Sequence, residues 1–331
     1  MTDPRHRVEK LRRRAVSLPA LAIGTLAITA TVPIWLPISL VVDLVRLRWR
    51  FPMARLLAMG VCWCWIESLG VARAFGLWAR GRSDDHAAHY ELMAWWSAAL
   101  MRSMRATAGM NPRIEGVEDL VAGDAIILAR HASLGDSLLS GWALVSEVGL
   151  QPRYVLKKEL LFDPCLDIVG LRVPNHFLDR EAIDGSVELE AIADMASGIG
   201  PGIVGVIFAE GTRTNAAKRA RALAKIAERE PERAERLGSL RRLLPPRPAG
   251  SMAMLDGAPD ADVVLVWHTG FDGLDSFAGM MREVARGLPP VRFVARRYPR
   301  DEVPEGERFV AWLDDHWLAM DAEVDAVLSS R

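Results

Sequence analysis

The chain has 331 residues, of which 50% are hydrophobic and 25% are charged, and its formal net charge is −1. This length suits one large α/β domain with an appendage, or two modest domains. A net charge near zero excludes an overall field that attracts nucleic acid, so attraction to an anionic surface has to come from local patches. Cys62, Cys64 and Cys165 match neither a zinc site nor a Cys-x-x-Cys redox pair, and a reducing, cytoplasmic setting is therefore expected.

The first 85 residues predict a basic and apolar helical region that associates with a membrane. Residues 15–42 carry no charged side chain, and about 20 apolar residues are enough to cross a hydrocarbon core. One spanning helix is therefore possible, but arginines lie on both sides of this stretch, whereas a single crossing leaves the basic excess on one side. Because Pro33 and Pro37 also interrupt it, we expect a hairpin that dips into the membrane, or two helices in the interface. Residues 56–79 predict an amphipathic surface helix.

Residues 86–331 predict an α/β domain, which starts with a helix over residues 88–108. Short β-branched runs alternate with helical stretches at 125–129, 153–156, 203–208, 263–267 and 291–295. This alternation predicts a mostly parallel sheet flanked by helices, in which ligands bind at the carboxyl ends of the strands. His131, Glu210 and His268 each lie within two residues of such an end.

His131 and Asp136 form the first candidate catalytic pair. Residues five apart on a helix differ by about 140° in azimuth, so the two side chains can face each other only if part of the segment is a loop. Gly135 allows such a loop, and Asp136 begins an apolar helix over residues 138–148, from which the carboxylate can fold back to the imidazole. Such a pair can activate an alcohol, because the carboxylate supports the cation that forms when the ring takes a proton. The structural alternative is a loop histidine that is capped by an aspartate at the N-terminus of the helix and has no catalytic role.

The second candidate motif is Glu210-Gly-Thr-Arg213, which follows directly on the run 203–208. At this position Gly211 lets backbone N–H groups approach an anion, and Arg213 offers a bidentate fork to a phosphate. The structural alternative is a tight strand-to-helix turn with a surface ion pair.

Three motifs follow one another in the chain: His131-x4-Asp136, Phe177-Leu-Asp-Arg180 and Phe208-x-Glu-Gly-Thr-Arg213. In this order and at these separations they resemble the first three blocks of the glycerolipid acyltransferase family typified by 1-acylglycerol-3-phosphate acyltransferases. The segment 244–247 resembles the proline-bearing fourth block, and segments 212–215 and 243–247 are similar to the subgroup of lysocardiolipin and larger lysophosphatidate acyltransferases. The resemblance covers about residues 110–275.

Two positions depart from the family pattern. Many members have Asn before the motif histidine, where this chain has Arg130, and many have Pro where this chain has Ala209. Neither change removes a reacting group. Arg130 is expected either to add positive charge near a substrate phosphate or to pair with Asp136 and weaken the catalytic pair.

The resemblance implies an enzyme that moves an acyl chain from acyl-CoA or acyl-carrier protein to the free hydroxyl of a lysophospholipid such as 1-acylglycerol-3-phosphate. His131, oriented by Asp136, would act as the general base, without a covalent acyl-enzyme. The implied substrate-binding residues are Arg180, Glu210, Gly211, Thr212, Arg213 and, as weaker candidates, Lys157 and Lys158. Among them, the arginines would hold the acceptor phosphate, Glu210 would order the arginines, and Thr212 would add a hydroxyl donor.

The expected partners are the acyl donor, the lysophospholipid acceptor and membrane lipids, with no nucleic acid, no metal and no cofactor. The expected location is a membrane, with the active site on its cytoplasmic face. Two alternatives remain at the level of the sequence: an acyl-thioesterase or lipase, and a catalytically silent lipid-binding membrane protein on the same fold. The charged helix 218–242 is interpreted as a solvated helix, with a basic lid over anionic groups as its functional alternative.

Overall fold

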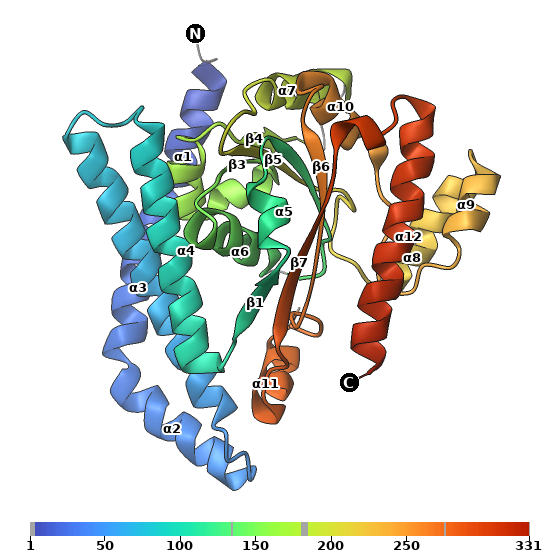
Figure 1. Cartoon of the computed structure of the whole chain (residues 1–331). Coiled ribbons are helices and arrows are strands. Elements are labelled where there is room, and N and C mark those ends of the chain that lie inside the picture. The colour runs from blue at the N-terminus through green and yellow to red at the C-terminus, as the bar shows by residue number, and fades with distance from the viewer. Residues whose placement is uncertain (1–3, 134, 180–184, 275, 331) are drawn as a thin grey trace. The chain divides into compact units, whose positions relative to one another are not determined.

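The computed structural model describes residues 4–133, 135–179, 185–274 and 276–330 (Figure 1). The chain forms two compact units, each assembled from separate segments. The first unit consists of Met1–Met110, Leu156–Phe177 and Ser276–Pro289. The second unit consists of Asn111–Val155, Leu178–Asp275 and Pro290–Arg331. These units are defined by contacts within each of them, and the domain division at residues 85 and 86 stays a prediction.

The first unit is helical and is organised around one long helix. Its helices are α1 (Pro4–Ala30), α2 (Val32–Val45), α3 (Pro52–Ala79), α4 (His86–Ala108), α11 (Phe277–Arg286), a 3₁₀ helix (Lys158–Phe162) and a π-helix (Leu166–Gly170). Helix α3 packs against α1, α2, α4 and α11. Asp167 joins α1 to the π-helix, because its buried carboxylate accepts hydrogen bonds from Arg13 and from Arg14 at 2.7 Å.

The N-terminal helices have the length and composition of membrane-associated helices. Helix α3 is long and apolar enough to cross a membrane, and so are Val8–Ala30 and Val32–Val45 taken together as a pair bent by 63°. The outer surface of α1 and α2 carries exposed apolar side chains, among them Val16, Ile23, Leu26, Ile34, Ile38 and Val41. Exposed apolar surface of this extent favours association with a membrane.

A seven-stranded sheet of order β1-β7-β6-β2-β5-β3-β4 forms the centre of the fold. Its strands are β1 (Pro112–Glu115), β2 (Ala125–Ala129), β3 (Gln151–Lys157), β4 (His176–Leu178), β5 (Ile203–Phe208), β6 (Asp262–Thr269) and β7 (Val291–Tyr298). Strands β1 and β7, β2 and β5, β2 and β6, and β3 and β5 pair in parallel, and β6 and β7 pair antiparallel. The predicted α/β fold with a mostly parallel sheet is thereby confirmed.

Helices of the second unit cover this sheet. They are α5 (Val117–Val121), α6 (Asp136–Gly141), which continues as a π-helix (Trp142–Glu147), α7 (Gly185–Ala196), α8 (Ala216–Ala227), α9 (Pro231–Leu237), α10 (Pro248–Gly257), a 3₁₀ helix (Arg300–Glu302) and α12 (Glu307–Ser329). Apolar side chains of α7, α10 and α12 form one hydrophobic core with β2 and β6. Helix α12 lies beside β6, as Figure 1 shows.

Candidate active site

The candidate site is built at the carboxyl ends of the three central parallel strands. Strand β2 lies between β5 and β6, and Ala129 at its end is in register with Phe208 of β5 and Val266 of β6. The segments that leave these strands therefore start at one edge of the sheet. Parallel sheets bind ligands at this edge.

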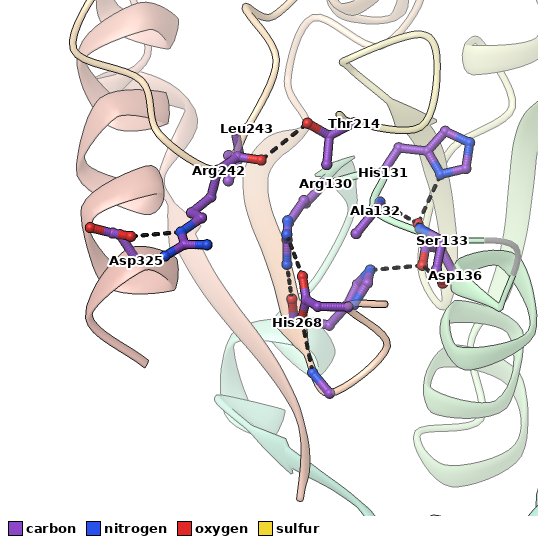
Figure 2. A network of polar contacts seen from close by, with 12 residues as sticks. Arg130, His131, Ala132, Ser133, Asp136, Thr214, Arg242, Leu243, His268 and Asp325 are labelled. Carbon is purple, nitrogen blue, oxygen red and sulfur yellow. Dashed lines mark hydrogen bonds and ion pairs between the residues drawn. The ribbon is translucent and has the colours of Figure 1, made fainter. Parts of the chain in front are cut away.

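His131 and Asp136 face each other at this edge (Figure 2). His131 Nδ1 lies 2.8 Å from Asp136 Oδ2, and the same oxygen accepts the backbone N–H groups of Ala132 at 2.6 Å and Ser133 at 2.8 Å. The Ser133 hydroxyl donates to Oδ1. Residues 131–133 are not helical, as expected, and Asp136 is the first residue of α6, so the carboxylate folds back over its own helix N-terminus. The structure thus brings together the two residues that the spacing had selected.

The Asp136 carboxylate is held in its charged form. Burial by itself raises the pKa of this group, but attraction from His268 and the hydrogen bond from His131 outweigh burial and hold the pKa of Asp136 well below its usual range. The His131 side chain is 15% exposed, and its ring packs against Phe208 with 4.8 Å between the ring centroids. Within the described residues Nε2 of His131 has no hydrogen-bond partner, so this nitrogen can accept a proton.

Glu210 is buried and connects the two halves of the site through backbone groups. Its Oε1 accepts the N–H of His131 at 2.9 Å, and its Oε2 accepts the N–H of Leu244 at 3.0 Å. Burial raises the pKa of Glu210 to about 8, against the effect of these donors and of Arg130. The sequence had suggested that Glu210 orders arginines, but in the part of the chain that the structure describes its carboxyl group receives no hydrogen bond from an arginine side chain.

The residues after Glu210 form a tight turn that has basic residues in it and next to it. Gly211 has a left-handed φ of +67°, which favours glycine, and a Cβ atom at this position would lie 3.1 Å from Cδ of Arg247. Lys218, in the first turn of α8, donates to the Thr212 hydroxyl at 3.2 Å and to the Arg213 carbonyl at 2.9 Å. Arg213 forms no side-chain hydrogen bond with the described residues.

Arg130 does not form the expected pair with Asp136, and its expected role near a substrate phosphate stays a prediction. One of its guanidinium nitrogens donates to Asp272 Oδ1 at 2.9 Å, and another donates to the backbone carbonyl of His268. Asp272 in turn accepts the N–H of Gly270 at 3.2 Å. The buried Arg130 side chain therefore holds the turn after β6, and it does not pair with Asp136.

Three further residues were predicted for the site: Arg180, Lys157 and Lys158. Arg180 falls outside the described residues. Lys157 ends β3 and Lys158 begins the following 3₁₀ helix; both belong to the first unit, where the Lys158 amine lies 3.6 Å from Glu9. Among the residues described, no cluster of three or more His, Cys, Asp or Glu could hold a metal ion.

Sequence reasoning missed the role of three neighbours of the site: His268, Asp272 and Lys218. His268 Nε2 lies 3.2 Å from Asp136 Oδ1. Its place at the end of a predicted strand was the only sequence signal, because its contact with Asp136 depends on the register of β6 beside β2.

Comparison with known proteins defines the class of the protein. The Acyltransferase family model matches residues 111–265, which include every residue of the site except His268 and Asp272. Among solved structures, the chain is similar to the 1-acyl-sn-glycerophosphate (LPA) acyltransferase PlsC from Thermotoga maritima, with a TM-score of 0.56 and 15% sequence identity over 83% of this chain and 98% of that one. No curated protein matches the chain in sequence.

The protein is therefore an acyltransferase enzyme. The Acyltransferase domain and the PlsC-like fold support its assignment to the glycerolipid acyltransferase family, as its motifs had indicated. Its assignment to the lysocardiolipin and larger lysophosphatidate subgroup stays a prediction.

Proposed function

We propose that the protein transfers an acyl chain from an acyl thioester to the free hydroxyl of a lysophospholipid, with 1-acylglycerol-3-phosphate as the acceptor. The donor is acyl-CoA or acyl-carrier protein. The observation that carries this proposal is the 2.8 Å contact between His131 Nδ1 and Asp136 Oδ2 in an acyltransferase domain, with Nε2 of His131 left to accept a proton.

In the proposed reaction His131 is the general base. Nε2 takes the proton from the lysophospholipid hydroxyl while the oxygen attacks the thioester carbonyl. Asp136 holds Nδ1–H and stabilises the imidazolium that forms, because its own carboxylate stays ionised. Collapse of the tetrahedral intermediate forms the ester, breaks the carbon–sulfur bond and releases the thiolate, which receives the proton from His131. The enzyme returns to its starting state without an acyl-enzyme.

The acceptor phosphate is proposed to bind at the turn after β5. Arg213 has no side-chain partner among the described residues, and Lys218 places a second cation in the same turn, where it donates to the Thr212 hydroxyl at 3.2 Å. Thr214 N–H donates to the His131 carbonyl at 2.9 Å, so this turn is attached to the segment that carries the general base. Arg180 remains a proposed phosphate ligand from its motif alone, and Lys157 and Lys158 remain weaker candidates.

The proposed setting is a membrane surface, with membrane lipids as partners and the active site on the cytoplasmic side. The exposed apolar surface of α1 and α2 supports the attachment. A lysophospholipid acceptor is itself a membrane component, so an attached enzyme meets its substrate where the substrate resides.

Mass spectrometry of the lipids formed by the purified full-length protein tests this function. The protein is offered acyl-CoA or acyl-carrier protein, with and without a panel of lysolipids, and we expect a diacyl product only when an acceptor is present. His131→Ala should lower the rate by about 10³-fold or more, while the protein stays folded and membrane-bound. His86→Ala, at an exposed position on α4, is the matched control. Release of free fatty acid regardless of acceptor indicates a thioesterase or lipase, and near-normal activity of His131→Ala overturns the assignment.

The phosphate site is tested in the same assay. Arg213→Ala should raise the KM for the acceptor by about 10- to 100-fold and leave the KM for the donor nearly unchanged, because one charged bidentate contact is lost. Arg221→Ala, on the exposed surface of α8, is the control. An unchanged acceptor KM in Arg213→Ala would place the phosphate elsewhere.

A further inference from the structure

A second histidine contacts the catalytic carboxylate from the side opposite to His131. His268 is the next-to-last residue of β6, and its side chain is 4% exposed. Its Nε2 is 3.2 Å from Asp136 Oδ1, whereas Nδ1 of His131 contacts Oδ2. Figure 2 shows Asp136 between the two imidazole rings. The carboxylate therefore has one histidine on each oxygen.

The ring of His268 is fixed in place, but its nitrogens are not used elsewhere. The backbone carbonyl of His268 accepts a hydrogen bond from Arg130, and the ring meets Phe271 edge-on at 5.9 Å between centroids. Neither ring nitrogen has a well-aligned hydrogen-bond partner among the described residues, and the contact with Asp136 is close in distance only. Buried polar atoms are nearly always satisfied, so an imidazole kept here beside a carboxylate calls for a functional explanation.

We propose that His268 is a positioning residue that shares Asp136 with His131 and sets how strongly Asp136 supports positive charge on His131. This inference rests on the proposed function, because it concerns the same general base. A donor at Oδ1 draws on the negative charge of the carboxylate, which leaves less of that charge to stabilise the His131 imidazolium. His131 then releases its proton more readily to the leaving thiolate.

The sign of the effect is the same for both protonation states of His268. A neutral ring that carries its hydrogen on Nε2 presents a polar N–H group 3.2 Å from Oδ1, and a charged ring presents a cation there; both offset the charge of Asp136. The other charged groups around the pair are Arg130 after β2, Asp272 after β6 and Glu210 after β5. Arg130 is paired with Asp272 at 2.9 Å, and Glu210 is engaged with two backbone N–H groups. Oδ1 also accepts the Ser133 hydroxyl, which stays in place when His268 is changed, so a His268 variant alters one of the two groups at this oxygen and none of these pairs.

The pH dependence of kcat/KM for the acceptor, at saturating donor, tests the proposal. Three variants of the full-length protein are compared: His268→Leu, which has no donor; His268→Gln, whose amide can replace Nε2; and His268→Asn, whose amide reaches only to the position of Nδ1. Without the donor, Asp136 supports the His131 cation more strongly, so the acidic limb of the profile should move by about 0.5 to 1 pH unit to higher pH. We expect this shift in the Leu and Asn variants and its reversal in the Gln variant.

The controls separate this role from a structural one. Melting temperatures are measured for all variants, since a merely structural role would lower Tm without moving the midpoint of the profile. If His268→Leu does not fold, the comparison of Gln with Asn alone decides the question. An unchanged midpoint, or a shift to lower pH, in the folded variants that lack the donor overturns the proposal. If His131→Ala is inactive and His268 variants show no shift, only this inference fails; if His131→Ala is active, the proposed function itself fails.

Discussion

Glu210 is a buried carboxyl group whose charge is expected to change near neutral pH. Burial raises its pKa from the ordinary value of 4.5 to about 8. Between these two pH values the unfolded chain has released its proton while the folded protein still holds it, so the contribution of Glu210 to stability falls as the pH rises. Below pH 4.5 both states are protonated and this contribution is constant.

We expect Glu210→Gln to be destabilising at low pH and less so at high pH. At pH 5 the cost should be about 1 to 3 kcal/mol. Only the oxygen of the glutamine amide can accept a hydrogen bond, so one of the two backbone N–H groups, that of His131 or that of Leu244, loses its acceptor. Toward pH 8 the natural protein loses the contribution of its protonated Glu210, whereas glutamine does not titrate, so the cost should shrink. Denaturant unfolding of both proteins at pH 5, 6.5 and 8 measures the difference. A cost that stays constant between pH 5 and 8 would show that Glu210 is already ionised in the folded protein.

The pairing of His131 with Asp136 could be predicted because it depends on short-range geometry. His131 and Asp136 are five residues apart, Gly135 lies between them, and a helix starts at Asp136. Together these features leave few ways to arrange the two side chains. The partners of Glu210 could not be predicted, because both are backbone N–H groups and any residue type can supply one. The contact of Arg130 with Asp272 also had no local signal, since the two residues are far apart in the chain and meet only through the pairing of β2 with β6.

Helix α12 supports the site through one of its aspartates. Asp321 is buried, and its carboxylate accepts the backbone N–H groups of three successive residues: Arg241 at 2.8 Å, Arg242 at 2.7 Å and Leu243 at 2.7 Å. The next residue, Leu244, donates to Glu210. The helix thus fixes the segment that reaches the buried end of the site.

Asp321→Ala should therefore reduce both stability and activity, although it lies on the last helix. We expect a loss of about 3 kcal/mol or more in the free energy of unfolding, because three buried donors lose a charged acceptor. The kcat should also fall, since the Leu244 contact with Glu210 loosens. Asp315→Ala, at an exposed position on the same helix, is the matched control and should change neither quantity. Normal activity and unchanged stability of Asp321→Ala would show that residues 241–244 keep their position without this carboxylate.

The strands with strong β-branched runs were predicted well, and the weaker ones were not. Strands β2 and β5 coincide with the predicted runs, and β3, β6 and β7 contain theirs. The short strands β1 and β4 were missed, because four and three residues carry too little pattern. The antiparallel direction of β7 has no local sequence mark, since it depends on the path of the chain between β6 and β7. The predicted helix 138–148 changes to a π-helix at Trp142, a change in hydrogen bonding that periodicity does not report.

At the scale of the whole molecule, the proposed attachment to lipid depends on the exposed apolar side chains of α1. Ile23 is 67% exposed and Leu26 is 64% exposed. Burial of each such side chain contributes about 1.5 to 3 kcal/mol, so Ile23→Gln with Leu26→Gln should lower the partition into vesicles by about 100-fold or more. Flotation with phosphatidylcholine and phosphatidylglycerol vesicles measures this. Val187→Gln, on exposed surface of α7, is the control. Equal flotation of the double variant would move the attachment to another surface.

The single carboxyl group of Glu210 has a consequence for engineering the enzyme. One hydrogen bond at each of its oxygens is all that separates the backbone of Leu244 from the backbone of His131. We therefore expect a graft that replaces the segment around Leu244, for example to alter substrate preference, to tilt the imidazole proposed as the general base as well. Selectivity and turnover will change together in such chimeras unless the new segment keeps an amide hydrogen where Leu244 has its own.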